Sequence, residues 1–219
     1  PGLWEAETRG TTVVIASSDV PFKDRSPARL HEQLRHEIFH LWIPNAVNLT
    51  GDYAWFYEGA ALYQSLKLGA ALKRIKFSDF LDTLSRAISI DRSMPVDRDW
   101  GRKLTPQHYA RAMVLAFLLD LQILQETNGG MSAGEGLKDI LRLRRHPFAA
   151  VDASDEILTR YGLRNLFFGY AFDSGKIFFS KEIEAAGLEA LDEGRTVRLS
   201  VASKPNAAQK AILKRLGYN

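Results

Sequence analysis

Cysteine is absent from the 219-residue sequence, so the chain forms no disulfide bond. A metal site in this chain would have to use histidine, aspartate and glutamate as its strong ligands. Long apolar runs are also missing. The longest, from Met113 to Leu124, is interrupted by Asp120 and is shorter than the roughly 20 residues that a membrane helix needs. The sequence predicts no membrane span, and the absence of cysteine suits either a reducing cytosol or a periplasm.

Charge of one sign is not concentrated in any part of the chain. The 29 lysine and arginine residues are spread among 26 acidic residues, for a formal net charge of +3. Nucleic-acid binding is therefore not predicted. The densest basic stretch, 141–146, alternates with leucines. It is interpreted as a solvated helix end, with a polyanion site as the alternative. Apolar residues make up 46% of the sequence and charged residues 25%, which is typical of a folded globular protein.

The apolar periodicity predicts a mainly α (α+β) protein with a few strands. A β-branched run at 11–17 predicts a strand that precedes the first helix. That helix, 28–42, is expected to end before Pro44, because proline cannot continue a helix. The irregular segment 94–103 is interpreted as a surface loop, with a lid or rim as the alternative. The other expected elements are helices at 52–68, 78–90, 105–127, 132–145, 154–161 and 206–216, and a strand at 195–201.

The chain is long enough to form one sizeable core and a smaller second unit. We expect a catalytic domain at 1–146 and a small mixed α/β unit at 147–219, with Pro147 at the boundary. Because the first residue is proline and a strand-like run follows almost at once, we expect the sequence to be a piece of a longer protein that lacks its N-terminal part. Neither the compartment nor the oligomeric state follows from the sequence.

Two histidines four residues apart form the strongest chemical signal in the sequence. In the segment HEIFH, His36 and His40 project from one face of the predicted helix and can bind a single metal ion together. Glu37 lies beside them, near enough to reach a water molecule on the metal. Zinc with three protein ligands lowers the pKa of such a water toward about 7, and a carboxylate can then accept its proton. His36 and His40 are therefore predicted zinc ligands, and Glu37 is the predicted catalytic base.

A third ligand is expected from the next predicted helix. Its segment WFYEG places Glu58 among aromatic residues, and a carboxylate in apolar surroundings is costly unless it is paired or bound to a metal. Glu58 is therefore predicted to complete a site for one zinc ion. The alternative interpretation is an ordinary glutamate on the surface of a helix.

Together, the two motifs resemble the active-site region of a known peptidase family. The segment 36–63, HEIFHLWIPNAVNLTGDYAWFYEGAALY, is similar to the glycyl aminopeptidase family of gluzincin zinc metallopeptidases, a group that includes aminopeptidase N and thermolysin. The resemblance implies a thermolysin-like helical catalytic domain in which Glu58 completes the zinc site. It covers roughly 1–125 and, more faintly, 168–187.

Within the segment 36–63, the chain departs from aminopeptidase N relatives at two points. Seventeen residues lie between His40 and Glu58, one fewer than is usual, and a loop can absorb this change. Tyr57 precedes the glutamate where those relatives commonly have asparagine. The second change bears on how the carboxylate of Glu58 is oriented.

The resemblance implies two further site residues. Tyr109, in the segment YARAM, is similar to the tyrosine that stabilises the developing oxyanion in these families. The adjacent His108 is the alternative donor, because thermolysin uses a histidine. Neighbouring helical residues diverge by about 100°, so only one of the two is expected to face the zinc. Glu5, in GLWEA, resembles the glutamate that binds the free amine of the substrate in aminopeptidase N relatives. A strand-edge glutamate without that role is the alternative.

These residues predict zinc-dependent hydrolysis of a peptide bond, with aminopeptidase activity on a peptide substrate as the favoured form. An endopeptidase or another zinc hydrolase on the same core is one alternative. A second is a metal-binding but catalytically silent interaction module. A third is a helical binding protein without metal, in which HEIFH is a coincidence.

Overall fold

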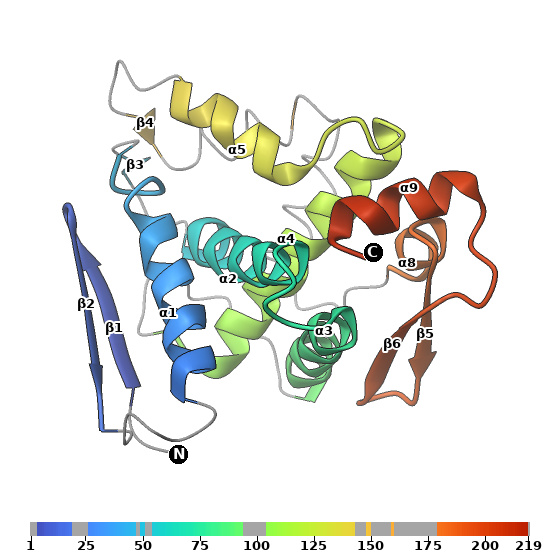
Figure 1. The fold of residues 1–219 in the computed structure, drawn as a ribbon, viewed down its shortest axis with the longest axis horizontal. Coiled ribbons are helices and arrows are strands. Elements are labelled where there is room, and N and C mark those ends of the chain that lie inside the picture. Colours follow the sequence, from blue (N-terminus) through green and yellow to red (C-terminus); the bar gives the residue numbers. More distant parts are fainter. Residues whose placement is uncertain are drawn as a thin grey trace.

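The computed structural model of the chain describes residues 4–18, 26–46, 49–50, 54–93, 104–142, 148–149, 159 and 179–218. In this part of the chain, packed helices form the centre and two antiparallel hairpins lie at opposite ends (Figure 1). The helices are α1 (Ser26–His40), α2 (Ala54–Ala71), α3 (Phe77–Ser93), α4 (Pro106–Glu126), α5 (Ala133–Arg142), α8 (Ser180–Ala185) and α9 (Ala207–Leu216). The strands are β1 (Trp4–Arg9), β2 (Thr12–Ser17), β3 (Leu49–Thr50), β4 (Phe148–Ala149), β5 (Leu188–Asp192) and β6 (Val197–Val201).

The predicted mainly helical architecture is confirmed, and the long helices lie close to their expected bounds. The first ends at His40, slightly earlier than expected, and turns lead from there to Pro44. The irregular segment 94–103 lies outside the described residues, as does the expected helix at 154–161 apart from residue 159. No helix in the described part of the chain combines the length and the apolar character needed to cross a bilayer.

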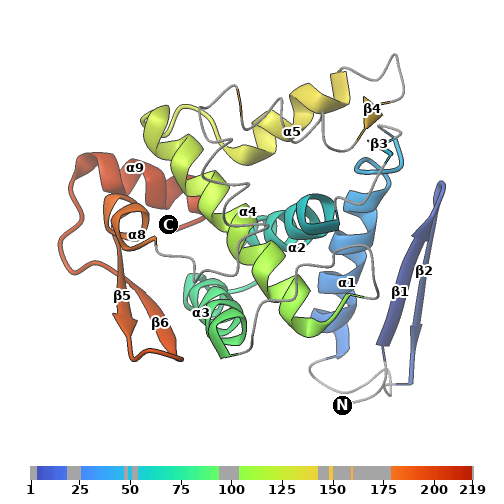
Figure 2. The same ribbon diagram turned by 180° about the vertical axis from the view of Figure 1, so that it is seen from behind.

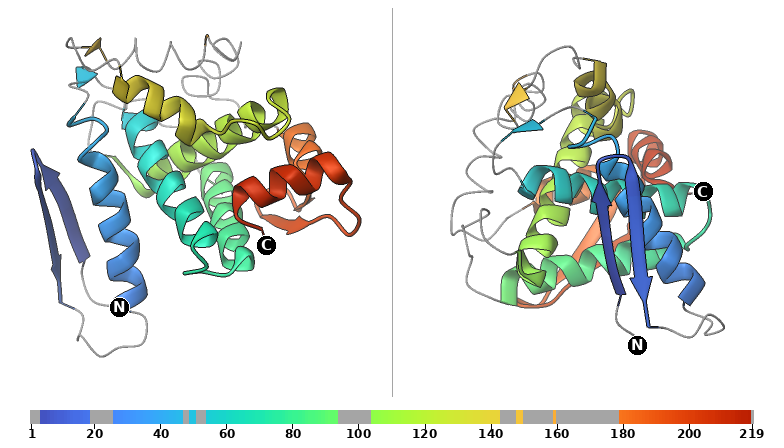
Figure 3. Two further views of the ribbon diagram at one scale, coloured as in Figure 1. Left: turned by 45° about the horizontal axis from the view of Figure 1, so that its top comes forward. Right: turned by 90° about the vertical axis from the view of Figure 1, so that its left-hand side faces the viewer.

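The β1–β2 hairpin covers one side of α1 (Figure 3). Its antiparallel strands meet in a turn at Gly10, whose φ of 57° lies in the left-handed region that glycine adopts without strain. Side chains alternate along β1, so that Ala6 and Thr8 are partly buried and the residues on either side of them are exposed. The cross-strand partners Ile15 and Val13 are also partly buried. The hairpin thus has one face that packs on the protein and one that meets solvent.

Helices α2 and α4 pack against each other at the centre of the molecule (Figure 2). Their backbones approach closely at Gly59, where an added Cβ would lie 2.8 Å from the carbonyl carbon of Ala112. Only glycine allows this approach, because any side chain would collide with the backbone of α4. Helix α4 is buried along most of its length, as its apolar sequence predicts. Thr105 caps its N-terminus and Pro106 opens its first turn.

Residues 179–218 pack against the same group of helices. The backbone amides of Val197 and Leu199 in β6 donate hydrogen bonds to the hydroxyls of Ser89 and Ser85 on α3, at 3.0 and 2.9 Å. Apolar side chains of this segment belong to the same buried cluster as those of α2, α3 and α4. The division of the chain into units at 1–146 and 147–219 stays a prediction.

Candidate metal centre

The two histidines of HEIFH and the glutamate of WFYEG converge where α1 packs against α2. His36 and His40 lie on the last turns of α1, and Glu58 lies near the start of α2. Each of the three side chains offers a ligand atom, and these atoms all lie within 4.8 Å of one another. The separation of four residues on α1 places both imidazoles on one face, and the packing of α2 brings the carboxylate to them. The described residues thus contain a His36, His40 and Glu58 group that could hold a metal ion, called here the metal cluster.

The spacing within the metal cluster fits a zinc ion. Nε2 of His40 lies 3.1 Å from Nε2 of His36. Nε2 of His36 is 3.3 Å from Oε2 of Glu58, and Nε2 of His40 is 3.6 Å from Oε1 of the same residue. Ligand atoms placed tetrahedrally around zinc at its usual bond lengths are separated by about 3.3 Å. Two imidazoles and one carboxylate, with a fourth position left for water, form a donor set typical of catalytic zinc sites.

The surroundings prepare these side chains to act as ligands. His40 Nδ1 lies 3.0 Å from the carbonyl oxygen of Ile43. A hydrogen bond there keeps the proton on Nδ1, so that the lone pair of Nε2 faces the cluster. Burial acts to raise the pKa of the Glu58 carboxyl, but interactions with the imidazoles of His36 and His40 outweigh it and hold that pKa at about 2. Glu58 is therefore an ionised, negatively charged ligand near neutral pH.

Glu37 is held beside the metal cluster by a residue of β1. Its side chain is 5% exposed. The hydroxyl of Thr8 lies 2.7 Å from Glu37 Oε2 and 2.8 Å from the Glu37 backbone carbonyl. Burial acts to lower the pKa of His40, but interactions with Glu58 and, more weakly, with the backbone of Ile43 and the charge of Glu37 raise it overall. The carboxylate of Glu37 thus acts electrostatically on one of the candidate ligands.

Tyr109 and His108 lie in different surroundings at the start of α4. Tyr109 is 38% exposed, and its pKa is raised by burial and then by the negative charges of Glu58 and Glu37. His108 is 3% exposed, and its Nδ1 accepts a hydrogen bond from the backbone amide of Thr105 at 3.1 Å. The Thr105 side chain accepts from the His108 amide in return, which completes a capping box. His108 therefore serves the helix terminus, and Tyr109 is the residue of the pair that is coupled to the acids of the site.

Glu5 lies apart from this group. It is exposed on β1, and the alternation of the strand places its side chain on the face opposite to that of Thr8. The structure thus brings His36, Glu37, His40 and Glu58 together, with Tyr109 in electrostatic reach, and leaves Glu5 on the outer side of the hairpin. The contact of Glu5 with a substrate amine stays a prediction.

Sequence reasoning missed two residues beside the metal cluster. Thr8 is the first, and the alternating pattern of 4–9 was the signal that could have placed it on the same face as Ala6. The second is Tyr57, which was noted only as a departure from relatives. Its ring packs edge-on against that of His40, with centroids 6.1 Å apart at 78°. Tyr57 thus contacts a candidate ligand directly.

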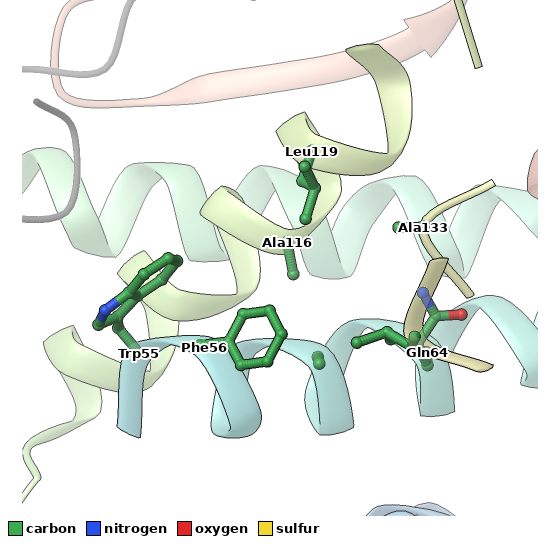
Figure 4. A pocket seen from close by; sticks show the side chains of 8 residues that line it. Trp55, Phe56, Gln64, Ala116, Leu119 and Ala133 are labelled. Carbon is green, nitrogen blue, oxygen red and sulfur yellow. The ribbon is translucent and has the colours of Figure 1, made fainter. Parts of the chain in front are cut away.

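The first two residues of WFYEG have a different role from that of Tyr57 and Glu58. Trp55 and Phe56 line an apolar pocket with residues of α4 and α5, among them Ala116 and Ala133 (Figure 4). Both side chains are almost fully buried. In the WFYEG segment, these two residues therefore anchor α2 in the core, whereas Tyr57 and Glu58 lie at the metal cluster.

No protein-family model and no curated protein matches the sequence. The fold is similar to that of an aminopeptidase N family protein from Idiomarina loihiensis, known from a crystal structure, with a TM-score of 0.70 and 12% sequence identity. The similarity covers 86% of this chain and 39% of that one, so this chain spans well under half the length of that protein. At this level of identity, the comparison shows a shared fold.

Proposed function

We propose that this chain carries the catalytic zinc site of a metallopeptidase, related to the glycyl aminopeptidase family of gluzincins. The observation that carries the proposal is the convergence of His36, His40 and Glu58 from two helices at the spacing of zinc ligands. The likeness in fold to an aminopeptidase N family protein supports the same reaction class. Because this chain spans only part of that protein's length, the activity of a whole enzyme is also part of the proposal.

The reaction proposed is hydrolysis of a peptide bond. A zinc ion bound by the metal cluster would lower the pKa of a water molecule and polarise the substrate carbonyl. Glu37 accepts the proton of the attacking water and passes it to the leaving amine. Its carboxylate is suited to this step because it is nearly buried and is held by a hydrogen bond from Thr8. Tyr109 donates a hydrogen bond from its hydroxyl to the oxygen on which negative charge develops.

The proton on Tyr109 is the property that its role requires. Burial and the nearby carboxylates raise the pKa of Tyr109 above that of an ordinary tyrosine. The phenol therefore stays protonated at neutral pH and remains a hydrogen-bond donor. Replacing Tyr109 by phenylalanine is expected to slow turnover by about a hundredfold or more, because one oxyanion donor is lost. A steady-state rate within a few-fold of the wild type would remove Tyr109 from the mechanism.

The substrate proposed is a peptide with a free N-terminus. This part of the proposal rests on the resemblance of Glu5 and of the zinc motifs to aminopeptidase N relatives. The alternative on the same core is an endopeptidase. A panel of aminoacyl reporter substrates, each compared with its N-acetylated form, separates the two, because an aminopeptidase hydrolyses only the unblocked members.

A catalytically silent, metal-binding interaction module is the candidate from another functional class. Metal analysis of the purified chain combined with Glu37→Gln tests the proposal against it. The wild type is expected to bind one zinc ion and to hydrolyse peptide, whereas Glu37→Gln keeps the zinc and loses hydrolysis, because the amide cannot accept the proton. Glu32→Gln is the matched control, since Glu32 is exposed one turn before His36 on the same helix and is not part of the metal cluster, and its loss should change neither property.

Three results would contradict the proposed function or a part of it. A wild-type chain that takes up no zinc from a buffered zinc solution would remove the metal site. A zinc-loaded wild type without hydrolysis of any peptide, blocked or free, would favour the silent module. Equal rates for wild type and Glu37→Gln would assign any observed activity to another group.

A further inference from the structure

We infer that Thr8 is a positioning residue, which holds the carboxylate of Glu37 in the orientation that proton transfer needs. The inference rests on the proposed function and adds to it a role for the β1–β2 hairpin, which contributes none of the metal ligands. Thr8 lies 29 residues before Glu37 in the sequence and reaches it only because the hairpin packs on α1. The zinc motif does not include it.

The geometry at Thr8 is that of a short hydrogen bond to one carboxylate oxygen. Its Oγ1 lies 2.7 Å from Oε2 of Glu37, within the usual range for a hydroxyl donating to a carboxylate. The partly buried face of β1 directs Thr8 inward, opposite Val13 of β2. Glu37 is nearly buried and Thr8 is partly buried, which strengthens the interaction relative to one on the surface. Thr8 therefore favours one rotamer of the Glu37 side chain, which would otherwise populate several.

The chemical consequence concerns the second oxygen of Glu37. A donor fixed on Oε2 leaves Oε1 as the acceptor for the proton of the attacking water. General-base catalysis is sensitive to such placement, because the base must lie within hydrogen-bond reach of the proton that it removes. A carboxylate that samples other rotamers is correctly placed for only part of the time, and the rate falls in proportion. Loss of the Thr8 hydroxyl is therefore expected to lower kcat while it leaves the zinc ligands untouched.

A purely structural role for Thr8 is the competing explanation. The carbonyl of Glu37 belongs to the last turn of α1, and the Thr8 hydroxyl also lies 2.8 Å from it. The carbonyls of Ile38, Phe39 and His40 accept hydrogen bonds from the amides that follow the helix. Thr8 could therefore serve only to fasten the hairpin to the end of α1. A variant that weakens this attachment without touching Glu37 separates the two explanations.

Asn45 provides that control. Its side-chain amide donates a hydrogen bond to the backbone carbonyl of Gly10 at 3.1 Å, and so ties the tip of the same hairpin to the segment after α1. Asn45→Ala removes this second attachment and leaves the carboxylate of Glu37 and its donor in place. If Thr8 only attached the hairpin to α1, the Thr8 and Asn45 variants would lose kcat to the same extent.

The experiment compares Thr8→Val, Thr8→Ala, Thr8→Ser and Asn45→Ala with the wild type, by zinc content, kcat and KM on a reporter peptide, and thermal unfolding. Thr8→Val keeps the shape of the side chain and removes the donor, and Thr8→Ala adds no bulk should valine disturb folding. Both are expected to lower kcat tenfold or more with unchanged zinc content and KM. Thr8→Ser keeps the hydroxyl and should stay within about threefold of the wild type, as should Asn45→Ala.

The possible failures are distinguishable. Wild-type kcat in Thr8→Val or Thr8→Ala would overturn this inference while leaving the proposed function intact. A fall in kcat that Asn45→Ala shares to the same degree would reduce Thr8 to a fastener of the hairpin. A wild-type chain without zinc-dependent hydrolysis would overturn the proposed function, and the inference with it.

Discussion

Helix α2 contributes to two polar clusters that differ in how their charges are matched. The metal cluster of His36, His40 and Glu58 lies near its start. Further along, Tyr63 and Lys67 meet Asp120 of α4 in what is called here the core cluster. Each cluster contains one carboxylate at a contact between helices, and each is largely removed from solvent. Their partners, however, are of opposite kinds.

In the core cluster, hydrogen-bond donors meet the carboxylate from several sides. The Tyr63 hydroxyl and the Lys67 ammonium each lie 2.6 Å from Asp120 Oδ2, and the amide of Ala133 donates to Oδ1 at 2.7 Å. The charge of Asp120 is neutralised by that of Lys67. Burial and the charge of Asp120 raise the pKa of Tyr63 far above its usual range, so its hydroxyl keeps the proton it donates. This cluster is complete without a ligand.

In the metal cluster, the groups that face one another are mainly acceptors. Imidazole nitrogens and a carboxylate approach to between 3.1 and 3.6 Å. Their lone pairs repel unless a proton or a cation lies between them. The contrast explains why only one of these two carboxylate clusters is a candidate functional site. Among the described residues, its acceptor atoms lack matching donors, and a divalent cation could bind between them.

The largest effect is expected from Glu58→Gln, which keeps the size of the side chain and removes its charge. Partners outside the coordination shell already change metal affinity by about 10–100-fold, so loss of a direct anionic ligand should weaken zinc binding about a thousandfold. The metal-free unfolding free energy should fall by about 1–2 kcal/mol, because the imidazoles of His36 and His40 favour the charged carboxyl of Glu58, whose side chain is still 16% exposed. Competition with a zinc chelator and chemical denaturation measure the two quantities. Zinc affinity near that of the wild type would mean that Glu58 is not a metal ligand, and the proposed contrast with the core cluster would fail.

The same type of change at the core cluster should have the opposite profile. Asp120→Asn leaves the ammonium of Lys67 nearly buried without a counter-charge, which is expected to cost about 3 kcal/mol in the free energy of unfolding. Zinc stoichiometry should remain at one ion per chain. Adding Lys67→Met to Asp120→Asn should recover much of the loss, since the double variant no longer buries an ammonium without a counter-charge. Wild-type stability of Asp120→Asn would mean that the charge of Asp120 does not stabilise the core cluster, contrary to its contact with Lys67.

The two clusters also differ in how far the sequence reveals them. His36 and His40 are four residues apart on one helix, so helical geometry alone predicts that they share a face. Glu58 depends on how two helices pack, and it was predicted through its apolar neighbours and a family resemblance. In the core cluster, Asp120 is 57 residues from Tyr63 and 53 from Lys67. In the sequence it stands out only as an interruption of an apolar run.

Strand β1 was missed by sequence reasoning for a physical reason. Strand β1 has a charged outer face, and its inward positions are occupied by small or polar side chains, Ala6 and Thr8. Periodicity built on large apolar residues does not detect such a strand. The register that pairs Thr8 with Val13, and the packing that brings it to Glu37, are tertiary properties. His108 was similarly weighed as an oxyanion donor because its role in the cap of α4 depends on contacts with Thr105.

A smaller effect is expected at Gly59, which lies between the residues that α2 gives to the two clusters. In Gly59→Ala, the new methyl group would collide with the backbone of Ala112 and push α4 away. Overpacking of this kind costs about 1–3 kcal/mol, and about 1 kcal/mol is regained because alanine favours the helix. A net loss of up to about 2 kcal/mol is expected in denaturant unfolding. Because α4 carries both Tyr109 and Asp120, kcat should also fall.

Gly69→Ala on the same helix is the matched control for this prediction. A Cβ at position 69 would make its nearest contact with the Arg35 side chain at 3.4 Å and with Ile75 at 3.6 Å, which are ordinary packing distances. This variant should therefore show only the helix-propensity gain, up to about 1 kcal/mol, with unchanged kcat. Equal responses at the two glycines would mean that the close crossing of α2 and α4 does not set the spacing of either cluster. A loss of stability in Gly59→Ala alone, together with lower kcat, would show that both clusters depend on the close contact of α2 and α4 at Gly59.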